Sequence, residues 1–464
     1  MDAGAHGGRD HRGHAGEPHR RGPGRLHRGA RAEPRHLHDR RQDAGGRLRG
    51  ERPSARVFAR AVRSASDRDL HERVRRGDVV TGGLPTSTRA AVVRAHGEPL
   101  TIEQVPLPER LAPGSLLVEV LACSVCGTDV HGWLGHLTIP AALPSVPGHE
   151  MVGRILAFGE GAELDSFGEP LATGDRVIWS HAPCGACEGC ASARDSALCS
   201  RPQMYGYLNC EQVPYGAGGF AEHSVVLPRA GRVRVPDAVS DELASVAACA
   251  VRSAANAVET LGRTKPSDTV LVQGSGPIGL FATAMLSLGS YRELVVVGGP
   301  ADRLALATSY GATATVSVEE HTTPEAREAA VLVATDGRRP TKMLEMSGGR
   351  TAFAEGLQLA GKGARYVLMG QVAGWDTPVP PGRITMKNLD VRGAFSGDIT
   401  HYREALLFLA QQAEHFDFSA IVSNRYGLSQ MNEAMENMRT MRDTKAVILP
   451  QRDRGSAFAV EVAA

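Results

Sequence analysis

The sequence lacks the features that would place it in a membrane or among disulfide-stabilised extracellular proteins. It has no run of about 18 consecutive apolar residues, the length that a membrane-spanning helix requires. Its N-terminus has no apolar segment of the kind found in signal peptides. Cysteine is scarce, with eight residues among 464, so a cytoplasmic, reducing location is expected. The net charge is only +1, which does not indicate a nucleic-acid partner for the chain as a whole.

What is present is typical of a folded protein. Hydrophobic residues make up 42% and charged residues 22% of the chain, which excludes wholesale disorder, collagen and coiled coil. The length suggests roughly three domains or lobes at about 150 residues each. We find no internal repeat. The chain is therefore long enough to bury a sizeable core.

The first 80 residues differ from the rest. They contain 20 arginines, no lysine, 11 acidic residues and eight of the 17 histidines, and so carry a charge of +9 while the remainder carries −8. This segment has no apolar periodicity, and we expect residues 1–85 to form a disordered extension. A basic nucleic-acid-binding arm is one interpretation. We favour an extension outside the mature protein, with a start near Val79 or Val80, because arginine without lysine is typical of GC-rich upstream DNA.

The remaining chain indicates two kinds of domain. Short β-rich runs broken by proline and glycine predict a β-rich lobe up to about residue 240. Strands then alternate with helices, which predicts βαβ units and a parallel sheet. The expected strands are 269–273, 294–297, 343–346, 366–370 and 389–393. After Gly393 the pattern is helix, strand, helix, strand and a polar tail.

Four cysteines have the spacing of a metal site. Cys184, Cys187, Cys190 and Cys199 form C-x2-C-x2-C-x8-C, and four thiolates in this arrangement suit a tetrahedral structural zinc. An iron–sulfur cluster is the rival, but its motif requires a cysteine where Arg194 stands. Four unliganded surface thiols are a poor alternative because exposed thiols oxidise.

A second set of potential metal ligands is dispersed along the chain. Cys126, His149 and Cys249 supply two thiolates and an imidazole, which is the three-ligand set of a catalytic zinc with a fourth position left for water or substrate. Each residue alone would more often be a buried cysteine or a hydrogen-bonded histidine.

A glycine motif indicates dinucleotide binding. Gly274, Gly276 and Gly279 form G-x-G-x-x-G between the strand 269–273 and an apolar helix, the context that the motif requires. These glycines allow a tight turn and a close approach of the pyrophosphate to the helix N-terminus. An ordinary strand–helix turn is the alternative.

Together these motifs resemble the zinc-dependent medium-chain alcohol dehydrogenase family over residues 86–450. Two segments, GEPLATGDRVIWS and FDFSAIVSNRYGL, point to a bacterial alcohol-dehydrogenase-like subgroup. The resemblance implies an α/β protein in which a GroES-like β-rich catalytic domain (86–250) is completed by residues 394–450. A doubly wound Rossmann domain (251–393) is inserted between them, and residues 451–464 form a polar tail.

The resemblance also implies roles for residues of the catalytic domain. Cys126, His149 and Cys249 match the catalytic ligands, and the four-cysteine set matches the structural-zinc lobe. Glu150 matches a carboxylate near the metal, and Asp129 matches the acid that orients the ligand histidine. Thr128 matches the hydroxyl that touches the substrate oxygen, and His131 the outer end of the proton relay. Two departures stand out. The last cysteine gap is eight residues rather than the usual seven, and Cys249 replaces the carboxylate of many polyol members.

In the family that the sequence resembles, an acidic residue binds the adenosine ribose. Its position corresponds to Gly298 here, so this chain lacks that acidic residue. No basic residue lies between 298 and 302 to bind a 2′-phosphate, and Arg303 is the nearest that could reach it. NAD is therefore favoured over NADP. Ser253 matches a residue near the nicotinamide, and Lys445 a pyrophosphate-binding residue.

The expected function is reversible, zinc-dependent hydride transfer between a secondary or polyol-like alcohol and NAD(P), in a homodimer or homotetramer. The proton would leave through Thr128 and His131. A zinc-free quinone reductase of the same superfamily is disfavoured by the complete ligand set. A non-enzymatic zinc- and nucleotide-binding protein would not need the proton relay. The sequence does not identify the alcohol.

Overall fold

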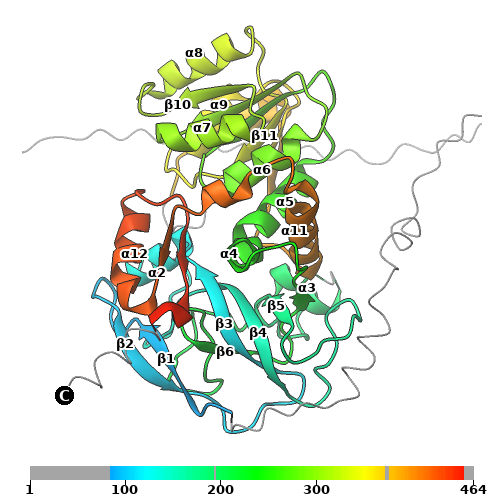
Figure 1. Ribbon diagram of the computed structural model, residues 1–464. Coiled ribbons are helices and arrows are strands. Elements are labelled where there is room, and N and C mark those ends of the chain that lie inside the picture. Colours follow the sequence, from blue (N-terminus) through cyan, green and yellow to red (C-terminus); the bar gives the residue numbers. More distant parts are fainter. Residues whose placement is uncertain (1–83, 193–194, 371–375, 454–464) are drawn as a thin grey trace, which may run out of the picture. The chain divides into compact units, whose positions relative to one another are not determined.

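Two large sheets organise the chain in the computed structural model, which describes residues 84–192, 195–370 and 376–453. All these residues belong to one compact unit (Figure 1). The extension predicted for residues 1–85 lies almost entirely outside the described residues, as does most of the polar tail. Within the described ranges no helix is long and apolar enough to cross a membrane.

The first sheet is mainly antiparallel and surrounds β3. The apolar residues of this strand make it almost completely buried. Along the sheet lie β14 (Asn424–Tyr426), β15 (Ala446–Ile448), β3 (Leu116–Ser124), β4 (Glu150–Phe158), β5 (Arg176–Trp179) and β7 (Arg232–Arg234), with β6 (His223–Val226) also paired to β3. A separate antiparallel pair is formed by β1 (Ser87–Val92) and β2 (Thr101–Pro106). Because β14 and β15 come from the C-terminal segment, the end of the chain completes this sheet.

The second sheet is parallel throughout its described strands. Its order is β10 (Ala314–Ser317), β9 (Glu293–Gly298), β8 (Thr269–Gln273), β11 (Lys342–Glu345), β12 (Arg365–Leu368) and β13 (Asp390–Gly393). This is the doubly wound order of dinucleotide-binding domains. Five of these strands were predicted, and β10 was not. Only one of its four residues is buried, so this edge strand has no apolar run to reveal it.

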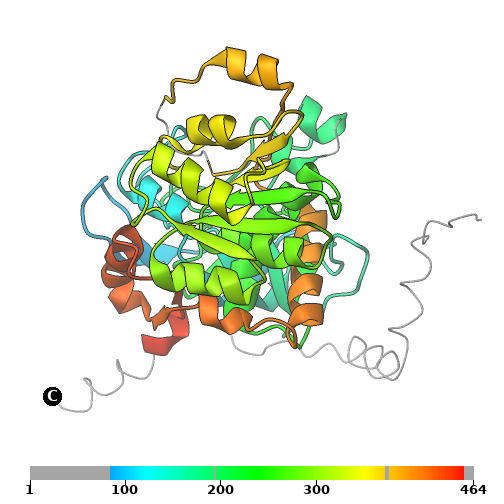
Figure 2. The same ribbon diagram turned by 90° about the horizontal axis from the view of Figure 1, so that it is seen from above.

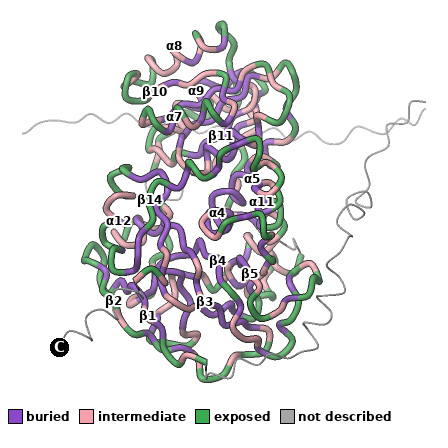
Figure 3. Tube along the Cα trace, viewed as in Figure 1, coloured by how far each residue is buried: buried purple, intermediate pink, exposed green. Residues whose placement is uncertain are grey.

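Helices cover both faces of the parallel sheet (Figure 2). One face packs against α5 (Arg252–Leu261), α6 (Pro277–Ser287) and α7 (Ala301–Ser309). The other packs against α8 (Pro324–Ala334), α9 (Ala352–Leu359) and, in part, α10 (Pro381–Lys387). Figure 3 shows the strands buried between these layers and the connecting loops exposed. This arrangement confirms the predicted Rossmann architecture.

A nearly continuous helical run joins the two sheets. It consists of α4 (Asp241–Val246), the π-helix η3 (Ala247–Val251) and α5. Its buried side chains share one core with Val152 of the first sheet and Val270 of the second. Helix α11 (Ile399–Gln412) packs beside it. The remaining described helices are α2 (Gly127–Trp133), α3 (Glu188–Ala191), α12 (Met431–Arg439), η2 (Ser196–Leu198), η4 (Phe418–Ile421), η5 (Leu428–Gln430) and η6 (Pro450–Asp453).

Candidate active site

Four potential ligands from three parts of the fold meet at the first sheet. Cys126 caps the N-terminus of α2, His149 and Glu150 stand at the start of β4, and Cys249 lies in the π-helix. Their ligand atoms all lie within 4.8 Å of one another. The structure thus brings the three residues predicted to bind a catalytic metal into one cluster, together with Glu150.

Asp129 fixes the position of His149. Its Oδ1 lies 3.3 Å from Nδ1 of His149 and accepts the Gly148 amide at 3.2 Å, while its Oδ2 accepts the Cys126 amide at 2.9 Å. Burial alone would lower the pKa of His149, but the Asp129 charge and hydrogen bond raise that pKa well above its usual value. Because Nδ1 is engaged, Nε2 is the imidazole nitrogen available to a metal.

Glu150 forms a buried ion pair behind the cluster. Nζ of Lys445 lies 2.5 Å from its Oε2, which also accepts a hydrogen bond from Ser124, and both charged side chains are almost fully buried. The resemblance assigns Lys445 to the cofactor pyrophosphate, which stays a prediction. In the structure its ammonium group lies against Glu150. Burial raises the pKa of Glu150 to about 7 even though Lys445 opposes the shift.

The donor set fits a divalent metal. Oε1 of Glu150 is buried and has no hydrogen-bond partner in the described part of the chain. A hydrogen bond from Cys126 lowers the pKa of the Cys249 thiol to about 5. The same hydrogen bond, followed by burial, raises the pKa of the Cys126 thiol to about 11. Two sulfurs, an imidazole nitrogen and a free carboxylate oxygen form the kind of site that zinc prefers.

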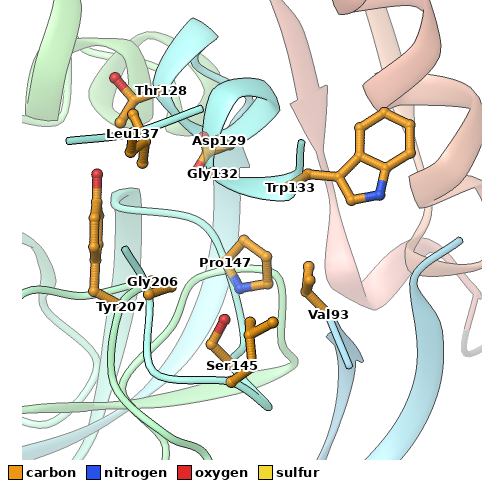
Figure 4. Close-up of a pocket in the computed structure, with 12 residues that line it drawn as sticks. Val93, Thr128, Asp129, Gly132, Trp133, Leu137, Ser145, Pro147, Gly206 and Tyr207 are labelled. Atoms are coloured by element: carbon orange, nitrogen blue, oxygen red, sulfur yellow. The ribbon is translucent and has the colours of Figure 1, made fainter. Parts of the chain in front are cut away.

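Thr128 and His131 lie one turn apart on α2, beside the cluster. The Thr128 amide donates to Sγ of Cys126 at 3.4 Å, and its side chain lines a cavity together with Leu137 and Tyr207 (Figure 4). Burial, followed by the neighbouring His136, lowers the pKa of His131. A neutral imidazole near physiological pH can accept a proton.

The second cysteine set also converges. The sulfurs of Cys184, Cys187, Cys190 and Cys199 lie within 4.8 Å of one another. Backbone hydrogen bonds, first from Ser200 and then from Cys190, lower the pKa of Cys187 to about 5. Sγ of Cys199 accepts the Cys184 amide at 3.2 Å. Thiolates stabilised in this way are suited to binding a metal.

The glycine motif lies at the β8–α6 turn. Gly274 has a φ of +110°, which a side chain would disfavour. A Cβ atom on Gly279 would lie 2.0 Å from the Gly274 carbonyl oxygen, whereas one on Gly276 would meet nothing within 4 Å. The structure therefore requires Gly279 for helix–strand packing and leaves open space at Gly276, as expected where a pyrophosphate approaches.

At the end of β9, where the resemblance places the ribose, the structure shows a contact that the sequence did not predict. Gly298 ends β9, and a Cβ atom there would lie 2.3 Å from Oγ of Ser275. Ser275 accepts the Gly299 amide at 2.9 Å and donates to its carbonyl at 3.0 Å. Its hydroxyl thus occupies the space that the side chain of an acidic residue at position 298 would need. The second position of the motif is unspecified, so the motif gives no signal for this contact.

The other expected cofactor residues, Arg303 and Ser253, lie on α7 and α5. Arg303 is buried, and its Nη2 donates to the carbonyls of Asp443 at 2.6 Å and Met441 at 3.4 Å. Its guanidinium is thus engaged with the C-terminal segment. Ser253 is buried on α5, one turn beyond Cys249.

The steric contact at Gly298 leads to a prediction about cofactor choice. Gly298→Asp alone should weaken binding of both nicotinamide cofactors, because its Cβ collides with Ser275. With Ser275→Gly added, the carboxylate should bind ribose hydroxyls and repel a 2′-phosphate. The NAD-to-NADP ratio of kcat/KM should then rise about 10- to 100-fold, the value of a charged hydrogen bond. Ser275→Gly alone is the control, and an unchanged ratio in the double variant would place Gly298 away from the ribose.

A doubly wound parallel sheet joined to a β-rich lobe, with two clusters of side chains that could hold a metal, is the architecture of a class of oxidoreductases. Two family models match, the "alcohol dehydrogenase GroES-like domain" over residues 112–237 and the "zinc-binding dehydrogenase" over residues 277–411. The chain belongs to the zinc-binding dehydrogenases of the medium-chain alcohol dehydrogenase family, which confirms the resemblance.

Similar proteins agree with this assignment. The chain is 31% identical over 365 residues to a 5-exo-hydroxycamphor dehydrogenase of Pseudomonas putida, covering 78% of this chain and 98% of that protein. It is 31% identical over 359 residues to an L-threonine 3-dehydrogenase of Serratia proteamaculans, and the match covers 76% of this chain and 96% of that protein. The solved structure of an alcohol dehydrogenase from Thermotoga maritima is 28% identical in sequence and superimposes with a TM-score of 0.72. The match covers 79% of this chain and 100% of that one.

Proposed function

We propose that the chain is a zinc-dependent oxidoreductase that transfers a hydride between a secondary or polyol-like alcohol and NAD(P). The observation that carries this proposal is the cluster of Cys126, His149 and Cys249 beside the cavity that Thr128 lines. Its relatives are named as dehydrogenases of a hydroxycamphor and of L-threonine. These names support an alcohol substrate for this chain without selecting one.

Each group of the site has a separate task in this proposal. When bound, zinc would supply a Lewis acid for the substrate oxygen, and the nicotinamide would accept the hydride. Asp129 holds the His149 ring in place through Nδ1. The Thr128 hydroxyl accepts the substrate proton and passes it on toward His131, whose lowered pKa keeps the ring neutral and able to receive it.

Three further assignments belong to the same proposal. The four-cysteine set holds a structural zinc, since four sulfurs leave no open position for a substrate. NAD is preferred to NADP, because Arg303 is engaged with the C-terminal segment and no basic residue lies between 298 and 302. The active protein is a homodimer or homotetramer, which light scattering can distinguish.

A substrate screen with metal analysis tests the proposal. The purified full chain should contain two zinc ions, and alcohols should be oxidised with NAD reduction followed by absorbance, NADP being run in parallel. A zinc-free protein would instead favour the quinone-reductase alternative. A zinc-loaded protein inactive on a broad alcohol panel with both cofactors would refute the dehydrogenase assignment.

The proton relay gives a pH-dependent prediction. His131→Gln should slow alcohol oxidation about tenfold near neutral pH. This is less than the 10²–10⁴-fold that positioned proton transfer typically contributes, because water can partly replace the outer member of a relay. The defect should shrink at high pH, where hydroxide accepts the proton. The measurement is a pH–rate profile with zinc content checked. His96→Gln, which changes an exposed histidine between β1 and β2, is the matched control. Loss of zinc in His131→Gln would make His131 a ligand or a structural residue.

A further inference from the structure

The end of α2 brings two histidines together. The helix closes with a Schellman motif, in which the Gly135 amide donates to the Gly132 carbonyl at 3.1 Å and the His136 amide donates to the His131 carbonyl at 2.8 Å. Gly135 has a φ of +73°, the left-handed conformation that this motif uses and that glycine adopts without strain. His131 stands in the last turn of the helix and His136 directly after the glycine, so the turn makes the two side chains neighbours.

The two rings are at a separation that one metal ion can bridge. Their centroids lie 6.1 Å apart, and the ring planes are tilted by 47°. A metal about 2.1 Å from a ring nitrogen lies about 3.2 Å from the ring centroid, so two rings on one ion are up to about 6.4 Å apart. His131 is half-buried and His136 is exposed. An ion can therefore reach the pair from solution, and the exposed ring can turn about its last torsion to face it.

The backbone under this pair is anchored to the rest of the β-rich lobe. Trp133, which lies between the two histidines in the sequence, donates from its indole Nε1 to the Glu98 carbonyl at 2.6 Å. Its own carbonyl accepts the Gly97 amide at 2.9 Å. These bonds join the end of α2 to the connection between β1 and β2. Ligands on such a support are partly positioned before an ion arrives, which reduces the entropy lost on binding.

The charges at the pair favour a metal ion over protons. Burial, followed by the charge of His136, lowers the pKa of His131, so the His131 ring is neutral near physiological pH. Two protonated rings at this separation repel each other, whereas a metal ion binds the neutral form of imidazole. Imidazole nitrogen suits zinc, copper and nickel, while magnesium and calcium prefer oxygen ligands.

We propose that His131 and His136 bind a divalent transition-metal ion such as Zn²⁺, and that this ion inhibits the enzyme by occupying the outer end of the proton relay. Water fills the remaining ligand positions, so this site differs from the two clusters described above. A neutral imidazole has one basic nitrogen, and an ion bound to His131 takes the lone pair that would receive the proton from Thr128. The effect on turnover rests on the dehydrogenase function proposed above, whereas the binding of the ion does not.

Titration of the zinc-loaded full chain with added Zn²⁺ tests the inhibition. Alcohol oxidation near neutral pH should fall to a plateau about tenfold below the rate without added Zn²⁺, because the ion removes the same group as His131→Gln and water still carries protons. His131→Gln itself should show no further inhibition. His136→Gln, compared with its own starting rate, should need at least about tenfold more Zn²⁺, since even loss of a supporting contact costs about 10- to 100-fold in metal affinity.

Two comparisons exclude other binding sites as the cause. His415→Gln removes an exposed histidine that follows α11 and should leave the inhibition unchanged. The eight histidines of residues 1–80 are present in every variant, so a difference between variants reports on the pair. Complete loss of activity in the wild type and in His131→Gln alike would place the inhibiting ion elsewhere and overturn the inference.

A binding measurement separates this inference from the proposed function. Ni²⁺ bound at the pair lies next to Trp133 and should quench tryptophan fluorescence, and residues 1–80 contain no tryptophan. The quenching should shift to at least about tenfold higher Ni²⁺ in His136→Gln and stay unchanged in His415→Gln. Quenching that does not depend on His136 would overturn the site. If no alcohol is oxidised with either cofactor but the quenching still depends on His136, the proposed function fails and the metal site stands.

Discussion

Replacing Cys126 by serine should abolish most of the activity while leaving the fold in place. The sulfur is one of three proposed ligands in a cluster whose donor atoms lie within 4.8 Å of one another, and serine is a far poorer zinc ligand. A bound metal stabilises developing negative charge by several kcal/mol, so kcat/KM for an oxidised alcohol should fall about 10³-fold or more. Metal analysis should show one zinc ion per chain instead of two.

The matched variant is Cys184→Ser in the four-cysteine set. It should also lose one zinc ion, but its main effect should be a lower melting temperature, because structural zinc contributes directly to folding. The two variants therefore distinguish the two sites, because Cys126→Ser should lose mainly activity and Cys184→Ser mainly stability. Unchanged turnover in Cys126→Ser would remove this cluster from the reaction.

The second large effect concerns the buried pair of Glu150 and Lys445. Lys445→Met should lower the free energy of unfolding by about 3–5 kcal/mol, because it leaves the carboxylate of Glu150 buried without its counter-charge. The loss should shrink as the pH falls, since burial already raises the pKa of Glu150 and a protonated carboxyl carries no charge. Urea unfolding of the zinc-loaded protein at several pH values measures both effects.

A double variant provides the control for this pair. Glu150→Gln with Lys445→Met removes both charges, so it should be more stable than Lys445→Met alone. If the double variant were as unstable as the sum of the two single changes, the ion pair would not be the cause. At a pH where Glu150 is ionised, well above its raised pKa, a loss well below 1 kcal/mol in Lys445→Met would indicate that water reaches the pair.

Much of the fold and of the ligand set could be predicted because the signals are local. The glycine motif follows an apolar strand, and the cysteine spacing of the structural lobe is confined to 16 consecutive positions. The contacts that were missed are made between distant segments. Lys445 reaches Glu150 from the other end of the chain, and Ser275 fills the space beside Gly298. Tyr207 lies beside Thr128 only because a loop returns to α2.

The π-helix that carries Cys249 restricts insertions and deletions in this part of the chain. Each residue of an α-helix turns the chain by about 100°, and the wide turn at Ala247–Val251 sets the rotation between α4 and α5. Deleting one alanine there would rotate everything that follows. Either Cys249 would leave the cluster, or the buried face of α5 with Ala254 and Ala257 would leave the core. Although this segment is mostly alanine and would tolerate many substitutions of similar size, it should tolerate no insertion or deletion.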